Sequence, residues 1–98
     1  MTQNVVCYVL SPNDNCATML HDVEPSQNVR MTGAVSGKIM SAEVIPCGFK
    51  IALTEFKSGD TIIKNGCPIG IATKRIIAGE MIHINNICSM CESEQNES

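Results

Sequence analysis

His83 is the residue of this chain best suited to acid–base chemistry near neutral pH, and two amide side chains follow it, Asn85 and Asn86. If the segment is a strand, alternation sends His83 and Asn85 to one face and the flanking isoleucines to the other. His83 could then serve as a base, an acid or a metal ligand, with Asn86 orienting it or a substrate hydroxyl. The simpler interpretation is an edge strand whose polar residues only face solvent.

Four further polar residues could recognise an anion. Lys50 and Lys64 could bind a carboxylate or sulfonate through charge-assisted hydrogen bonds. Lys50 is the stronger candidate because it follows Gly48, where backbone can approach a ligand closely. Asp14 and Asn15 precede a predicted helix, whose N-terminus could attract an anion while one of these side chains caps it. Solvated lysines and plain helix caps are the simpler alternatives.

Six cysteines are many for a chain of 98 residues. Cys88 and Cys91 form a C-x-x-C pair that could give two thiolates to zinc or an iron–sulfur cluster, although no second pair stands at finger spacing. The N-terminus has no basic region like that of a secretory signal, which argues against a disulfide framework. The remaining four are dispersed among apolar residues and are predicted to be reduced core thiols: Cys7, Cys16, Cys47 and Cys67.

Composition narrows the class of protein. A length of 98 residues fits one domain, and three aromatic residues without Trp make its core aliphatic. Seven Lys and Arg residues, a net charge of -3 and few aromatics argue against nucleic-acid binding. No apolar stretch approaches the roughly 20 residues of a membrane span. We therefore expect a cytoplasmic protein that contacts neither nucleic acid nor membrane.

The apolar pattern predicts a mainly β fold with one short helix near the N-terminus. Strands are predicted over 5–10, 28–34, 38–45, 49–56, 61–63, 67–72 and 81–84, and the helix over 16–22. Asn65-Gly66 predicts a type I′ hairpin, because both residues accept a positive φ. No internal repeat is evident. The domain is expected over 1–88, followed by a polar and disordered tail over 89–98.

Several motifs resemble the SAF domain of the altronate dehydratase family over roughly residues 12–89. The similarity is carried by Gly48-x-Lys50, Gly59-Asp60, Ile63-Lys64-x-Gly66, Gly79-Glu80-x-x-His83-x-x-Asn86 and Asp14-Asn15-Cys16-Ala17-Thr18. The resemblance implies a β-clip fold. It also implies a small subunit that helps a large dehydratase subunit eliminate water, or sulfite, from a sugar acid or related hydroxy acid.

The resemblance extends to cofactor and site. It implies a divalent metal, usually iron, shared with or held by the large subunit, with His83 as catalytic residue and metal ligand. Lys50, Asp14, Asn15 and Asn86 would bind the substrate, and a homo-oligomer of the domain is a further alternative. Three positions where the family commonly has His carry other residues here: Phe49, Met81 and Asn85. The alternative is therefore a non-catalytic binding or assembly module that keeps the fold.

Overall fold

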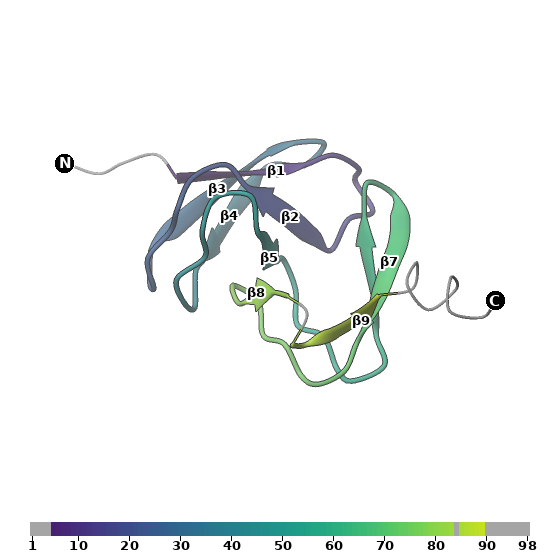
Figure 1. The fold of residues 1–98 in the computed structure, drawn as a ribbon. Helices are drawn as coiled ribbons and strands as arrows, with labels where there is room; N and C mark the ends of the chain where they lie inside the picture. Colours follow the sequence, from purple (N-terminus) through teal and green to yellow (C-terminus); the bar gives the residue numbers. More distant parts are fainter. Residues whose placement is uncertain (1–4, 84, 90–98) are drawn as a thin grey trace.

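The computed structural model describes residues 5–83 and 85–89, and this part of the chain is built from short strands (Figure 1). The strands are β1 (Val5–Val9), β2 (Cys16–Met19), β3 (Asn28–Gly33), β4 (Gly37–Met40), β5 (Lys50–Ala52), β6 (Thr61–Lys64), β7 (Cys67–Ala72), β8 (Met81–Ile82) and β9 (Ile87–Ser89). The prediction of a mainly β fold is confirmed. The described residues contain no helix long and apolar enough to cross a membrane.

The strands form two sheets. The larger has the order β4-β3-β1-β2-β5-β8, and the smaller has the order β6-β7-β9. β1 lies parallel to β3 and antiparallel to β2, whereas the other named pairings are antiparallel. In Figure 1 the larger sheet curls over the molecule, and the smaller sheet stands beside it. Consecutive strands β8 and β9 belong to different sheets, so the turn between them joins the two.

The prediction of a helix over 16–22 is wrong, because Cys16–Met19 forms strand β2. β2 lies in the middle of the larger sheet, between β1 and β5, and Cys16, Ala17 and Met19 are all buried. A strand buried on both faces shows no alternation of apolar and polar residues. Its short apolar run therefore cannot be told from a helical turn by periodicity alone.

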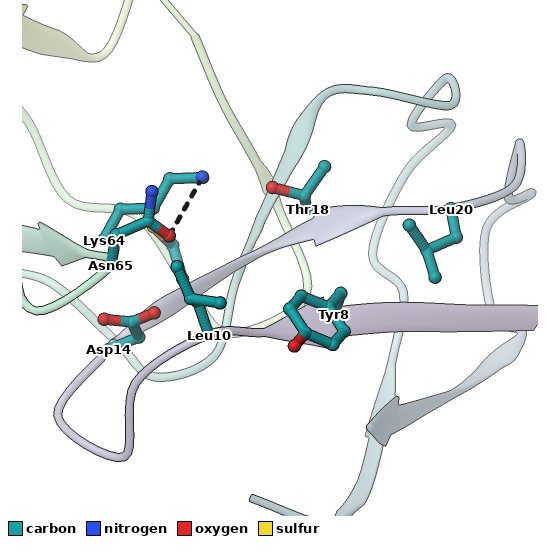
Figure 2. A pocket seen from close by; sticks show the side chains of 8 residues that line it. Tyr8, Leu10, Asp14, Thr18, Leu20, Lys64 and Asn65 are labelled. Atoms are coloured by element: carbon teal, nitrogen blue, oxygen red, sulfur yellow. Dashed lines mark hydrogen bonds between the residues drawn. The ribbon is translucent and has the colours of Figure 1, made fainter. Parts of the chain in front are cut away.

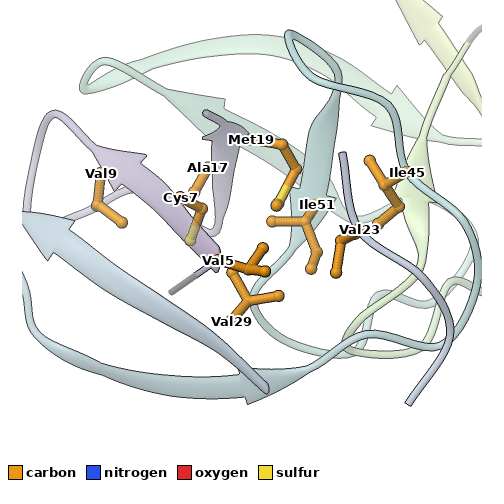
Figure 3. Close-up of a cluster of buried hydrophobic side chains, with 9 residues drawn as sticks. All are labelled: Val5, Cys7, Val9, Ala17, Met19, Val23, Val29, Ile45 and Ile51. Carbon is orange, nitrogen blue, oxygen red and sulfur yellow. The ribbon is translucent and has the colours of Figure 1, made fainter. Parts of the chain in front are cut away.

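Two hydrophobic cores explain this double burial. The first gathers around β1, β2 and β5 and is drawn in Figure 3: Val5, Cys7, Val9, Ala17, Met19, Val23, Val29, Ile45 and Ile51. The second contains Cys16, Ala52, Phe56, Ile62, Ala72, Ile76 and Ile82. Ala17 and its cross-strand partner Ile51 belong to the first core, and their neighbours Cys16 and Ala52 belong to the second. Because successive side chains point to opposite faces, β2 and β5 separate the two cores.

A five-residue turn recurs four times, although no internal repeat was expected. Each copy has a buried apolar residue, two variable residues, a residue with positive φ and a residue that leads into a strand. The copies are 23–27, 45–49, 56–60 and 76–80, with positive φ at Ser26, Gly48, Gly59 and Gly79. Their first residues pair as isolated bridges, Val23 with Ile45 and Phe56 with Ile76. The repeat is too short and too variable to stand out in the sequence.

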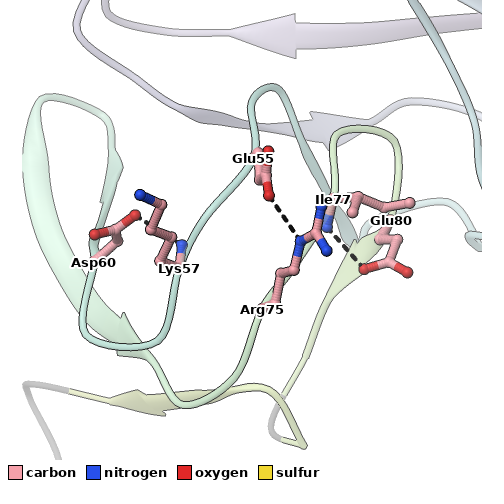
Figure 4. Close-up of polar contacts among 6 residues, drawn as sticks. All are labelled: Glu55, Lys57, Asp60, Arg75, Ile77 and Glu80. Atoms are coloured by element: carbon pink, nitrogen blue, oxygen red, sulfur yellow. Dashed lines mark hydrogen bonds and ion pairs between the residues drawn. The ribbon is translucent and has the colours of Figure 1, made fainter.

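Most of these turns are closed by their own last side chain. The Asp60 carboxylate accepts the amide of Lys57 at 2.8 Å, and the Glu80 carboxylate accepts the amide of Ile77 at 3.0 Å (Figure 4). Gln27 does the same for Glu24 at 2.8 Å. These bonds satisfy amides that the turn would otherwise leave unpaired. Several of the chain's acidic residues are therefore engaged with its own backbone.

The turn at 45–49 ends in Phe49, whose side chain cannot accept a hydrogen bond. Here Asp22, from the neighbouring turn, accepts the amide of Cys47 at 2.8 Å. At Gly79 the constraint is tighter, since a Cβ there would overlap the carbonyl oxygen of Met40. Gly79 has φ +96°, so this position requires glycine for both backbone conformation and space.

Candidate functional site

An open pocket of about 390 Å³ lies between the outer face of β1 and β2 and the tip of the β6–β7 hairpin. Figure 2 shows Lys64, Asn65 and Asp14 on one side, Tyr8 and Thr18 on the other, and Leu10 between them. Tyr8 and Thr18 are direct cross-strand partners and therefore share one face of the sheet. The lining residues are Tyr8, Leu10, Asp14, Cys16, Thr18, Leu20, Lys64 and Asn65.

The hairpin tip presents one cation to this pocket. Asn65 and Gly66 have φ values of +58° and +79°, which confirms the predicted type I′ turn. The Lys64 ammonium donates to the Asn65 side-chain oxygen over 3.4 Å, a long contact that leaves it further donors for a ligand.

Asp14 fastens the hairpin tip to the end of β1. Its Oδ1 accepts the amide of Gly66 at 2.8 Å, and its Oδ2 accepts the amide of Ser11 at 3.1 Å. Burial raises the pKa of this carboxyl, but hydrogen bonds from the backbone, that of Gly66 foremost, outweigh it and hold the pKa below its usual value. Asp14 lines the pocket as a carboxylate whose two oxygens are already in use.

Asn15 fastens the same hairpin at β6. Its Oδ1 accepts the amide of Ile63 at 2.8 Å, and its Nδ2 donates to the carbonyl of Thr61 at 3.1 Å. The backbone amide of Asn15 adds a bond to the Ile63 carbonyl at 3.2 Å. We call the side chains of Asp14 and Asn15 the latch. Neither caps a helix, and the substrate-binding role predicted for them remains a prediction.

Lys50 lies on the sheet face that floors the pocket, since it is the cross-strand partner of Thr18. Its charge is felt at the Cys16 thiol. Burial raises the pKa of Cys16 to about 11, the charges of Lys50 and Lys64 oppose this, and Asp14 adds to it. Two predicted substrate-binding residues, Lys50 and Asp14, therefore influence the same buried thiol as Lys64, although Lys50 does not itself line the pocket.

His83 and Asn86 lie elsewhere, in the turn that joins β8 to β9, and neither lines the pocket. Asn86 is only 6% exposed, and its side chain accepts the His83 amide and donates to the Met81 carbonyl, each at 2.9 Å. The half-buried His83 accepts the Asn85 amide at Nδ1 over 3.3 Å, and its Nε2 takes part in no hydrogen bond within the described residues. Asn86 shapes the turn, and His83 keeps one ring nitrogen for other contacts.

The described residues do not fit a metal centre. No group of three or more His, Cys, Asp and Glu side chains that could hold an ion occurs within 5–83 and 85–89. His83 alone does not complete a divalent-metal site, which takes several protein ligands. Cys88 is exposed, and its predicted partner Cys91 lies outside the described residues.

The core-thiol prediction holds for two cysteines and fails for two. Cys7 and Cys16 are buried free thiols, whereas Cys47 and Cys67 are exposed free thiols. Cys47 occupies a variable position of the 45–49 turn, and Cys67 directly follows the type I′ turn. Neighbouring apolar residues misled the prediction, because both positions stand at turns rather than inside buried strands.

Sequence reasoning missed most of the pocket walls. Tyr8, Leu10, Thr18 and Leu20 attracted no functional interpretation, yet all line the pocket. Tyr8 and Leu10 alternate with buried residues of β1, which was a usable signal for a shared outer face. Thr18 and Leu20 carried no such signal while their segment was assigned to a helix.

Residues 5–90 match the family model for the altronate/galactarate dehydratase SAF domain, and the chain belongs to that family. It is 37% identical over 73 residues to altronate dehydratase of Bacillus subtilis (strain 168). The match covers 74% of this chain and 14% of the length of that protein.

Proposed function

We propose that this chain is the SAF module of a sugar-acid dehydratase and acts as a small subunit beside a larger one. The observation that carries the proposal is the family match over 5–90 together with the similarity to altronate dehydratase. The reaction would eliminate water, or sulfite, from a hydroxy acid next to its carboxylate. Because the aligned region is 14% of that relative, most of the length of such an enzyme lies outside the part this chain resembles.

The chemistry of elimination supports a partner. The reaction needs a base for the α-proton, a cation for the enolate-like charge and an acid for the leaving group. His83 offers a single imidazole, and the described residues hold no metal-binding cluster. In this proposal the large subunit holds the divalent metal and most of the reacting groups. This chain adds Lys50 and Lys64 for the acid group and the Nε2 atom of His83 for a proton transfer.

A specific observation favours the alternative of a non-catalytic assembly module. The side chains of Asp14, Asn15 and Asn86 are all bound to backbone groups of the domain itself. Three of the five predicted site residues therefore have a structural role that involves no substrate. A module of this kind would still bind the large subunit but would leave its turnover unchanged.

Reconstitution of the enzyme distinguishes a catalytic small subunit from a non-catalytic assembly module. The chain should be purified alone and together with a candidate large dehydratase subunit, and formation of keto acid from altronate or galactarate should be measured. We expect no turnover by the chain alone and turnover by the pair. Robust turnover by the chain alone would overturn the small-subunit proposal. Equal turnover by the large subunit with and without the chain would favour the assembly module.

A further inference from the structure

The sheet face at the pocket carries a row of residues whose side chains can donate hydrogen bonds, two of which line the pocket itself. Tyr8 of β1 is the cross-strand partner of Thr18 of β2, which is in turn the partner of Lys50 of β5. Direct partners project to the same face, so Tyr8, Thr18 and Lys50 stand in a row across three neighbouring strands. Lys64 lines the same pocket as Tyr8 and Thr18 from the hairpin tip (Figure 2).

The charge of this face is opposite to that of the whole chain. Arg30 pairs with Val6, which lies on the same face of β1 as Tyr8, and Lys38 is the partner of Arg30. Four of the seven Lys and Arg residues therefore lie on or over a single face of a chain with net charge -3. The concentration of cations gives this face a local attraction for anions.

Neither Lys64, which lines the pocket, nor Lys50, the cross-strand partner of Thr18, forms an ion pair in the described part. The single ion pair found there joins Arg75 to Glu55, and neither of these residues lines the pocket. Asp14 also lines the pocket, and its two carboxylate oxygens accept the amides of Gly66 and Ser11. An incoming carboxylate would find ammonium donors that no side-chain carboxylate of the described residues already occupies.

The remaining lining is apolar and open. Tyr8, Leu10 and Leu20 are 42%, 52% and 45% exposed, which is high for side chains of their size. A ligand with a charged end and a carbon chain matches this division into a cationic end and an apolar wall. Tyr8 and Thr18 can also meet ligand hydroxyls.

We propose that this pocket binds a small hydroxy acid through its carboxylate, with Lys64 and Lys50 as the cationic contacts and Thr18 and Tyr8 as hydroxyl contacts. The choice of a hydroxy acid rests on the proposed function, whereas the choice of a carboxylate rests on the charges. The latch is a positioning device in this site, because it fixes the hairpin that carries Lys64.

Galactarate and galactitol are matched probes, because they share carbon skeleton and hydroxyl configuration and differ in the terminal carboxylates. Each should be titrated into the ¹⁵N-labelled chain while the amide spectrum is followed to about 50 mM, well above a Kd of about 1 mM. We expect saturable shifts at Tyr8, Thr18, Lys64 and Asn65 with galactarate and none with galactitol. Equal binding of galactitol, or the absence of saturable shifts with galactarate, would overturn the proposal.

Two charge-matched variants locate the contact. Lys64→Gln should weaken galactarate binding about tenfold, the usual effect of losing one charge-assisted hydrogen bond. Lys74→Gln removes an equal charge from an exposed residue that does not line the pocket and should leave the affinity unchanged. Equal weakening by both variants would show attraction to overall charge and would overturn the site. Both spectra should keep their dispersion, which shows that the fold is retained.

The experiment needs no partner subunit. Loss of carboxylate binding by the 98-residue chain would leave the reconstitution result as it stands, and failure of reconstitution would leave the titration as it stands. The two proposals therefore fail separately.

Discussion

Replacing Asn15 with Ala should remove the β6 half of the latch and destabilise the whole domain. The change deletes the bond to the Ile63 amide at 2.8 Å and the bond to the Thr61 carbonyl at 3.1 Å. Each lost hydrogen bond is worth about 1 kcal/mol, and leaving the partly buried Ile63 amide unpaired adds about 1 kcal/mol more. We expect a loss of about 2–3 kcal/mol in the free energy of unfolding.

Urea denaturation followed by circular dichroism measures this loss, and thermal unfolding should show it as a fall in Tm of roughly 10–20 °C. Asn13→Ala is the matched control. Asn13 is exposed two residues earlier, and its side chain makes no hydrogen bond within the described residues. Its replacement should change stability by no more than about 0.5 kcal/mol.

Asn15→Asp refines the test, because a carboxylate still accepts from the Ile63 amide but cannot donate to the Thr61 carbonyl. Its stability should fall between those of the wild type and Asn15→Ala. A loss below about 0.5 kcal/mol for Asn15→Ala would refute the latch and leave Asn15 available as a substrate ligand.

Three further predictions concern single positions. Gly79→Ala should lower the free energy of unfolding by more than about 3 kcal/mol, because its Cβ would overlap backbone. At Gly48 a Cβ meets nothing within 4 Å, so Gly48→Ala should lower it only by the strain of positive φ, about 1–3 kcal/mol. Urea denaturation measures both losses. Burial raises the pKa of Cys7 and Cys16 from 9.0 to about 11. Their contribution to the free energy of unfolding is therefore complete below pH 9 and is lost as the pH rises towards 11. Unfolding curves measured across this range should show the decline, and a rise would contradict it. His83→Ala should change stability by no more than about 0.5 kcal/mol but lower the turnover of a reconstituted enzyme by about 100-fold, and normal turnover would favour the assembly module.

The sequence was most informative where residue chemistry is local. Asn65-Gly66 identified the hairpin turn, because few residues accept positive φ at two successive positions. The glycines at 48, 59 and 79 marked turns for the same reason. The predicted strands over 38–45 and 49–56 ran too far, since their second halves form loop and turn and only Gly37–Met40 and Lys50–Ala52 are strands.

The sequence was least informative where distant segments meet. The assignment of β2 as a helix failed because only its pairing with β1 and β5 reveals that both of its faces are buried. The partners of Asn15 lie 46 and 48 residues away, a separation that no local pattern reports. Bringing Lys64 to the sheet face that carries Tyr8, Thr18 and Lys50 likewise depends on how the hairpin folds back. The lysines were recognisable as anion ligands, but their meeting at one sheet face was not.

The separation of the two cores by β2 and β5 has a consequence for motion. The hairpin and the smaller sheet rest on one face of these strands, and the first core fills the other face. A segment packed this way can open as a local cooperative unit while the rest of the domain stays folded. The pocket lies at the boundary between these halves, with Lys64 on one and Tyr8 on the other. Any ligand that bridges them would slow amide hydrogen exchange in β6 and β7 and leave the exchange of β1 and β3 unchanged, which makes the hairpin a reporter of pocket occupancy.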